Sequence, residues 1–162
     1  YCVYGIGKIP DIFAGQGISR ELPAHGNQEV LEAVITAMQD LTEPGLIFAN
    51  FVDFDMLWGH RNDSQGYAKG LETLDKQLPA ILDKMAPGDL LVITADHGCD
   101  PTTPGTDHSR EYVPLIVMGA GVSGCKSLGV RETFADLAAS IAECFGLNWQ
   151  GAGTSFWSSL TC

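Results

Sequence analysis

Three of the four histidines lie close to aspartates in the sequence, in a pattern typical of metal-binding sites. Asp55 precedes His60 in DFDMLWGH, Asp96 precedes His97 in ADHG, and His108 ends the segment GTDH. Neutral imidazole together with carboxylate suits a borderline divalent metal such as Mn²⁺, Zn²⁺ or Fe²⁺. Cysteine is absent from these positions, which argues against a structural zinc site. The five side chains are therefore candidate metal ligands.

Five ligands are too many for one tetrahedral ion, so the pattern favours two ions. Paired ions about 3.5–4 Å apart can hold the attacking and leaving oxygens of a phosphoryl transfer. Asp96 and His97 would point to opposite faces of a regular strand, but Gly98 allows the backbone to turn so that both reach one ion. The alternative is that each is an ordinary cap, turn or surface residue. The grouping of three Asp–His pairs favours ligation, whereas His25 is assigned an ordinary role.

Basic residues near these groups are candidates for binding phosphate. Lys8 follows the first predicted strand, where its ammonium could neutralise a phosphate or remain a solvated surface charge. Arg61 and Arg110 each lie close to a proposed ligand and could contact phosphate or support the ligands. Asp107 could orient His108 or stay in solvent. Cys99 is interpreted as a small apolar filler rather than a nucleophile.

Alternating strands and helices would position these residues. The apolar patterns predict strands over 2–6, 46–54, 90–95 and 113–118, and helices over 29–41, 64–85 and 132–145. Asn27 is expected to cap the first helix, Pro79 to kink or restart the second, and Gly146 to close the last. This order predicts an α/β fold, a mostly parallel sheet with helices on both faces. Ligands of such sheets gather at the carboxyl ends of the strands, where the Asp–His groups fall.

Composition and charge narrow the class of protein further. The chain has 162 residues, 45% of them hydrophobic and 18% charged, which indicates one globular domain. A net charge of -11 without a basic cluster argues against a nucleic-acid partner. No apolar run approaches the roughly 20 residues of a membrane helix, so no membrane partner is expected. Five cysteines without a CxxC pair indicate buried free thiols in a reducing compartment, the cytoplasm.

Several segments together resemble the phosphopentomutase family of the alkaline phosphatase superfamily. They are GIGKIPDIFAGQGI, VDFDMLWGHRND, LLVITADHGCDPTTPGTDHSREYVP, RETFADLAASIA and GTSF, which span essentially the whole chain. The run PGTDHSRE after DHG is specific to the family, whereas DHG alone would indicate only the superfamily. The resemblance implies an alkaline phosphatase-like core and an isomerase that interconverts ribose or 2-deoxyribose 1-phosphate and 5-phosphate. It implies two Mn²⁺ ions, with other divalent metals possible, and a phosphothreonine that passes phosphate through a bisphosphate intermediate.

The resemblance also implies roles for individual residues. It divides the metal ligands between two ions, with Asp55, His60 and His108 on one and Asp96 and His97 on the other. Lys8 would lie near the substrate phosphate. The threonine nucleophile, a further metal-binding aspartate and the cap domain would lie upstream of Tyr1. We therefore expect residues 1–162 to be the carboxyl-terminal, metal-binding portion of the catalytic domain, without a catalytic nucleophile and without turnover on its own.

Two other interpretations remain open. The chain could belong to another member of the superfamily, such as a cofactor-independent phosphoglycerate mutase or a metal phosphohydrolase. It could also be a non-catalytic module that binds metal. PGTDHSRE and VDFDMLWGH favour the pentomutase, whose substrate would be a small pentose phosphate. The sequence indicates no oligomeric state.

Overall fold

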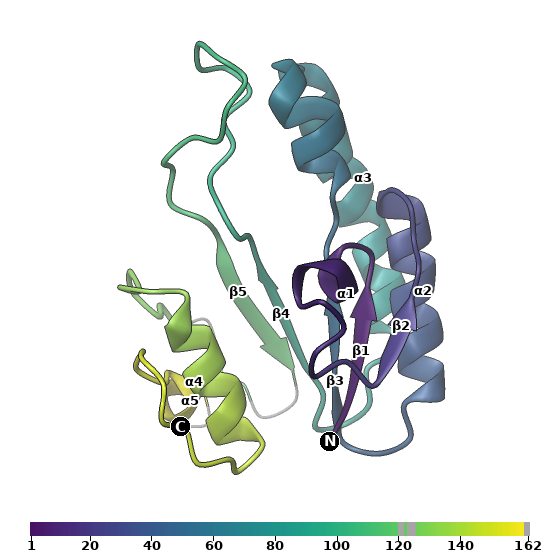
Figure 1. Ribbon diagram of the computed structural model, residues 1–162, viewed down its shortest axis with the longest axis vertical. Helices are drawn as coiled ribbons and strands as arrows, with labels where there is room; N and C mark the ends of the chain where they lie inside the picture. Colours follow the sequence, from purple (N-terminus) through teal and green to yellow (C-terminus); the bar gives the residue numbers. More distant parts are fainter. Residues whose placement is uncertain (120–121, 123–125, 161–162) are drawn as a thin grey trace. The chain divides into compact units, whose positions relative to one another are not determined.

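The computed structural model describes residues 1–119, 122 and 126–160. The chain forms two compact units (Figure 1). The first comprises Tyr1–Met85 and His97–Tyr112, and the second comprises Ala86–Asp96 and Val113–Cys162. Each unit has its own sheet and its own helices, and they are described separately.

The first unit is built on a parallel sheet, as the alternating pattern predicted. Its strands are β1 (Cys2–Ile6), β2 (Arg20–Leu22) and β3 (Gly45–Ala49), in the order β2-β1-β3. The pairing of β1 with β3 ends at Ile6 and Ala49. Since parallel strands end at the same edge, the segments that follow β1 and β3 leave the sheet together. These segments carry Lys8 and Asp55.

Helices of the first unit pack on this sheet through their apolar faces. α1 (Ile9–Ile12) directly follows β1, and α2 (Asn27–Asp40) contacts β1 and β3. α2 buries the stripe Val30, Leu31, Val34 and Ala37. The cap prediction for this helix was wrong. Gly26 occupies the N-cap position, and the Asn27 side chain instead accepts a hydrogen bond from the Asp53 backbone N–H.

The apolar run after β3 does not continue as a strand. β3 ends at Ala49, five residues short of the predicted end, and the chain then forms a π-helix, η1 (Phe54–Trp58), and a 3₁₀ turn, η2 (Gly59–Arg61). The Phe54 ring packs edge-on against Trp58 and Tyr67, with centroids 5.3 Å apart in both pairs. Apolar content alone does not distinguish a buried strand from a buried helical turn, which explains the error.

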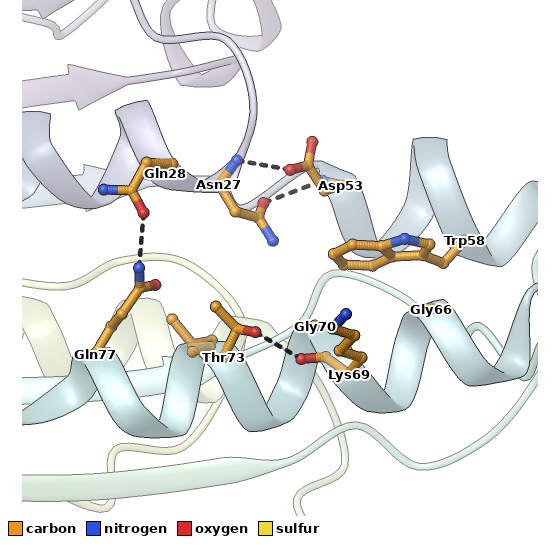
Figure 2. Close-up of a pocket in the computed structure, with 10 residues that line it drawn as sticks. Asn27, Gln28, Asp53, Trp58, Gly66, Lys69, Gly70, Thr73 and Gln77 are labelled. Atoms are coloured by element: carbon orange, nitrogen blue, oxygen red, sulfur yellow. Dashed lines mark hydrogen bonds between the residues drawn. The ribbon is translucent and has the colours of Figure 1, made fainter.

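α3 (Ser64–Leu82) runs without a break through Pro79, so the second helix start expected there is wrong. The Trp58 ring lies against α3 where two glycines are spaced one turn apart (Figure 2). A Cβ on Gly66 or Gly70 would collide with the indole ring. The two glycines therefore form a flat groove that seats Trp58.

Gly70→Ala should consequently destabilise the chain. In an exposed helix the same change stabilises by about 0.5–1 kcal/mol, but the new Cβ would here force Trp58 out of its seat. We expect a net loss of about 1–3 kcal/mol, typical of overpacking. Urea unfolding followed by far-UV circular dichroism would measure it. Lys76→Ala, on the exposed surface of the same helix, is the control, and a stabilised Gly70→Ala protein would contradict the prediction.

The second unit contains an antiparallel strand pair. β4 (Leu90–Thr94) pairs with β5 (Leu115–Gly119) from Leu90 opposite Gly119 to Thr94 opposite Leu115. The described strands thus form two sheets, of which the one in the first unit is parallel and the one in the second unit is antiparallel. α4 (Ala135–Cys144) and the short α5 (Trp157–Leu160) follow. Gly146 has a left-handed φ of 65° just after α4, as its predicted closing role requires.

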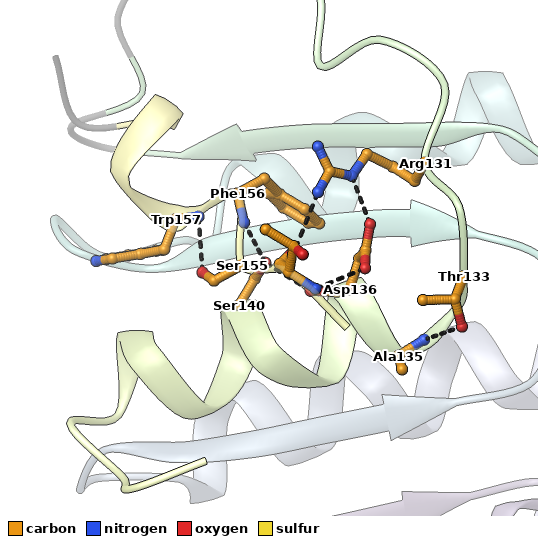
Figure 3. A network of polar contacts seen from close by, with 9 residues as sticks. Arg131, Thr133, Ala135, Asp136, Ser140, Ser155, Phe156 and Trp157 are labelled. Carbon is orange, nitrogen blue, oxygen red and sulfur yellow. Dashed lines mark hydrogen bonds and ion pairs between the residues drawn. The ribbon is translucent and has the colours of Figure 1, made fainter. Parts of the chain in front are cut away.

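A buried carboxylate ties α4 to the segment that precedes α5 (Figure 3). Asp136, only 4% exposed, accepts hydrogen bonds from Arg131 Nε at 2.8 Å and from the Thr154 backbone N–H at 2.7 Å. Ser140 Oγ donates to the Asp136 carbonyl at 2.7 Å and accepts from the Phe156 backbone N–H at 2.8 Å. Thr154 and Phe156 of the GTSF motif are therefore both held by hydrogen bonds to α4.

Acid should weaken this network. The Thr154 N–H, and after it the Arg131 guanidinium, hold the pKa of Asp136 below its ordinary value. A carboxyl with a lowered pKa in the folded state stabilises the fold above the unfolded value of about 3.9. That stabilisation is lost as the pH falls from there through the folded pKa. We expect the urea midpoint to fall in this window and the fall to be smaller in Asp136→Asn. Equal pH profiles for the two proteins would contradict this role.

The three cysteines that the structure describes are free but not buried. Cys2 and Cys99 are half-buried and Cys144 is exposed, so the expectation of buried thiols is wrong for these three. Cys144 occupies the last turn of α4. Cys125 and Cys162 lie outside the described residues.

Candidate metal centre

Four of the predicted ligands converge in the first unit, and we call Asp55, His60, His97 and His108 the Asp–His cluster. Asp55 Oδ1 lies 3.3 Å from His60 Nε2, 3.2 Å from His108 Nε2 and 4.0 Å from His97 Nε2. The His108 ring stacks on His97 with centroids 3.5 Å apart and on His60 at 4.9 Å. Asp55, His60 and His108 each offer a ligand atom within 4.8 Å of the others.

The π-helix explains how two residues five apart in sequence come to face each other. In an α-helix, positions five apart lie about 140° apart around the axis. The Gly59 N–H that closes η1 is instead shared between the Asp55 carbonyl, four residues back, and the Phe54 carbonyl, five residues back, so the turn is wider than an α-helical turn and brings residues five apart closer to one face. Asp55 and His60 have this spacing. Asn62, with a left-handed φ of 53°, then ends η2.

A single backbone bridge brings the other two histidines together. Gly98 pairs with Ser109, whose N–H donates to the Gly98 carbonyl at 3.1 Å. Ser109 Oγ also accepts from the Asp100 N–H at 2.6 Å. A Cβ on Gly98 would collide with the Ser109 carbonyl, so this close approach requires glycine. His97 and His108 flank the bridge and therefore meet.

One residue that sequence reasoning missed orients His60. The Thr106 carbonyl accepts a hydrogen bond from His60 Nδ1. Because a carbonyl can only accept, Nδ1 carries a proton, and Nε2 is the ring atom that faces Asp55. Such partners fix metal-binding imidazoles in many proteins. A backbone carbonyl has no residue-type signature, so no signal in the sequence could have found Thr106.

The arrangement fits a cation. Asp55 Oδ1 is buried and has no hydrogen-bond partner among the described residues. It faces the Nε2 atoms of His60 and His108, so that three atoms able to bind a metal ion converge. Ligand atoms at about 2.0–2.2 Å from a tetrahedral ion lie about 3.4 Å apart. The observed 3.2 and 3.3 Å separations are close to that value.

Cys99 lies beside the cluster without the character of a nucleophile. Burial, and after it the negative charge of Asp55, raises the pKa of the Cys99 thiol. Burial likewise raises the pKa of Tyr67, with smaller contributions from Cys99 and Asp55. A Cβ on Gly59 would collide with Cys99 Sγ. Cys99 thus packs against η2 as a protonated thiol at neutral pH, in keeping with its interpretation as a filler.

The remaining predicted site residues lie outside the Asp–His cluster or on the surface. Asp96 belongs to the second unit, whereas the Asp–His cluster belongs to the first. Its role as a ligand therefore stays a prediction. Lys8 is exposed at the N-terminus of α1, just beyond the carboxyl end of β1. Arg61, Arg110 and Asp107 are also exposed.

Comparison with known proteins supports these observations. The profile of the Metalloenzyme superfamily matches residues 11–149. The phosphopentomutase of Anaeromyxobacter sp. (strain K) is 58% identical over 98% of the chain. That of Carboxydothermus hydrogenoformans is 52% identical over 99% of the chain. The chain spans 40% and 41% of their respective lengths. The PH0037 protein of Pyrococcus horikoshii has the same fold, with a TM-score of 0.55 and 20% identity over 74% of this chain and 32% of its own.

Proposed function

The chain belongs to the Metalloenzyme superfamily, and on that premise we propose that Asp55, His60 and His108 of its Asp–His cluster bind a divalent metal ion for phosphoryl transfer in a phosphopentomutase. The observation that carries the proposal is Asp55 Oδ1, which is buried, lacks a hydrogen-bond partner among the described residues and faces two imidazole nitrogens. Identities of 52–58% with phosphopentomutases support the choice of reaction. Since the chain spans about 40% of those relatives, the reaction is proposed for the assembled enzyme.

Residues of this chain would share two ions, which we propose to be Mn²⁺, although other divalent metals could serve. Asp55, His60 and His108 would hold one of them, and Asp96 with His97 the other. When bound, such ions supply positive charge that neutralises phosphate oxygens and stabilises the charge that develops in phosphoryl transfer. The ligands are oxygen and nitrogen only, as this chemistry prefers.

The chain's own side chains would orient the site and bind the substrate. Thr106 keeps Nδ1 of His60 protonated, so that Nε2 stays available as a ligand. Lys8, beyond the carboxyl end of β1, would place its ammonium near the phosphate of a pentose phosphate. We assign no nucleophile within these 162 residues.

A chimera tests the proposed reaction. The matching segment of the Carboxydothermus hydrogenoformans phosphopentomutase, 52% identical over 161 residues, would be replaced by this chain. We expect the purified chimera to convert ribose 1-phosphate to ribose 5-phosphate in the presence of Mn²⁺, in a coupled assay of the product. His60→Ala in the chimera should lower the rate at least about 100-fold, since a ligand matters no less than its supporting partners.

Other outcomes would point to the other candidate functions. Activity of a folded chimera on phosphoglycerate but not on ribose 1-phosphate would overturn the pentomutase assignment. A folded chimera that binds Mn²⁺ but turns over neither substrate would favour a non-catalytic metal-binding module.

We propose that the protein acts in the cytoplasm on small molecules. The free thiols of Cys2, Cys99 and Cys144 support a reducing compartment. None of the described helices combines the length and the apolar character needed to cross a membrane. The net charge of -11 speaks against nucleic acid as a partner.

A further inference from the structure

A reciprocal pair of hydrogen bonds joins the start of α2 to the start of η1 (Figure 2). The Asn27 backbone N–H donates to Asp53 Oδ2 at 2.8 Å, and the Asp53 backbone N–H donates to Asn27 Oδ1 at 3.1 Å. The two residues are 26 positions apart in the chain. Asp53 is the residue immediately before η1 and lies two positions before Asp55.

Only one of these two hydrogen bonds satisfies a backbone group of α2. The Asp53 carboxylate satisfies an N–H at the start of α2, as an N-cap side chain would. The second bond satisfies no group of α2. It restrains the backbone of Asp53 through a side chain on a helix whose first turns are anchored in the core by Val30 and Leu31. The pair therefore transmits the position of α2 to the segment that carries Asp55.

Close packing at Gly26 makes this junction specific. Gly26 has a φ of 82°, and a Cβ there would lie 3.3 Å from Asp53 Oδ2. The chain thus approaches the Asp53 carboxylate more closely than most side chains would permit.

The other end of η1 is held independently. Trp58, its last residue, is seated in the groove that Gly66 and Gly70 form on α3 (Figure 2). Asp55 therefore lies in a segment of five residues with an anchor at each end. The anchor at Trp58 is an apolar contact, whereas the hydrogen bonds at Asp53 also fix direction. The orientation of the Asp55 carboxylate should accordingly depend on the Asn27–Asp53 pair.

We propose that Asn27 and Asp53 are positioning residues of the metal centre: they fix the first turn of η1 so that Asp55 Oδ1 faces His60 and His108. The inference rests on the proposed metal binding and adds residues that touch neither metal nor substrate. Residues that orient a metal ligand without binding the metal typically lower metal affinity by about 10–100-fold when they are removed.

Four variants of the 162-residue chain would test this role. Asp53→Ala and Asn27→Ala each remove a side chain of the pair, whereas Asp53→Asn keeps an acceptor for the Asn27 N–H. Glu29→Ala is the matched control, because Glu29 Oε2 accepts the His25 backbone N–H at 2.7 Å at the same end of α2. It weakens the start of the helix without touching η1.

Two readouts separate positioning from general stability. Calorimetric titration with Mn²⁺ gives the Kd, and the visible absorption of bound Co²⁺ reports ligand geometry. We expect Asp53→Ala and Asn27→Ala to weaken Mn²⁺ binding by about 10–100-fold and to alter the Co²⁺ spectrum. Asp53→Asn should retain most of the affinity, and Glu29→Ala should match the unsubstituted chain. Circular dichroism would verify that each protein is folded at the titration temperature.

The outcomes distinguish the inference from its premise. If the unsubstituted chain binds Mn²⁺ and folded Asp53→Ala binds it equally well with the same Co²⁺ spectrum, the positioning role is overturned alone. If Glu29→Ala weakens binding as much as Asp53→Ala, the effect belongs to α2 stability and the role is again overturned. If the unsubstituted chain binds neither metal, the proposed metal centre fails and the inference fails with it.

Discussion

Asp55→Ala is expected to weaken Mn²⁺ binding by more than about 100-fold, beyond the effect of removing a supporting partner. Asp55 supplies the cluster's only carboxylate, and its Oδ1 lies 3.2–3.3 Å from both His60 and His108 Nε2. Without it, two neutral imidazoles would face the ion with no negative charge to offset it. Calorimetric titration at neutral pH would measure the change in Kd.

Asp107→Ala is the matched control for this substitution. It removes the same functional group from an exposed position next to His108, with the same change in net charge. We expect its Kd to stay close to that of the unsubstituted chain. Equal Kd values for folded Asp55→Ala and the unsubstituted chain would remove Asp55 from the site.

The metal-free protein should respond to Asp55→Ala in the opposite direction. A buried acceptor without a partner costs free energy in the folded state, so its removal relieves that cost. The melting temperature without metal should therefore not fall, even though metal binding is lost.

Mn²⁺ should raise the melting temperature of the chain substantially. A ligand that binds only the folded state stabilises by about 2.7 kcal/mol at 100 times its Kd. For a chain of this size each kcal/mol corresponds to about 2–4 °C, so we expect a rise of about 5–11 °C. The stabilisation arises because the bound cation would sit among the Asp55 carboxylate and the His60 and His108 imidazoles, whose ligand atoms lie close together in the folded state. Differential scanning calorimetry with and without Mn²⁺ would measure it.

His60→Ala and chelation provide the controls for this shift. EDTA should return the unsubstituted chain to its metal-free melting temperature, and His60→Ala should show little response to Mn²⁺. Hydrogen exchange should slow in η1, η2 and residues 97–112, which carry the cluster. An unchanged melting temperature at saturating Mn²⁺ would contradict an assembled site.

The sequence predicts which side chains come together better than it predicts the structure that brings them together. Asp55, His60 and His108 are identifiable because metal ligation restricts residue type and because they follow apolar segments. Their approach depends on a π-turn and on a backbone bridge between Gly98 and Ser109, neither of which has a periodic signature. Residue type thus identified the side chains of the Asp–His cluster but not the geometry that joins them.

Long apolar patterns gave the elements correctly but not their ends or directions. β1 matches its predicted range, and α2 and α3 are present with shifted ends. Local patterns do not encode pairing partners, so they could not predict that β5 runs antiparallel to β4. Asn27 illustrates the same limit, because its residue type fits an N-cap while its actual partner, Asp53, lies far along the chain.

The π-helix makes the number of residues in η1 a constraint separate from their identity. Met56 and Leu57 are 48% and 54% exposed, so many side chains could replace them without touching the core. Deletion of either residue would instead shorten by one residue the path between the Asn27–Asp53 pair and the seat of Trp58, so that the two anchors could not both be kept with Asp55 in its present place. Within η1, insertions and deletions should be far rarer among homologues than substitutions. Homologues should therefore keep the number of residues in this segment even where the residues themselves differ.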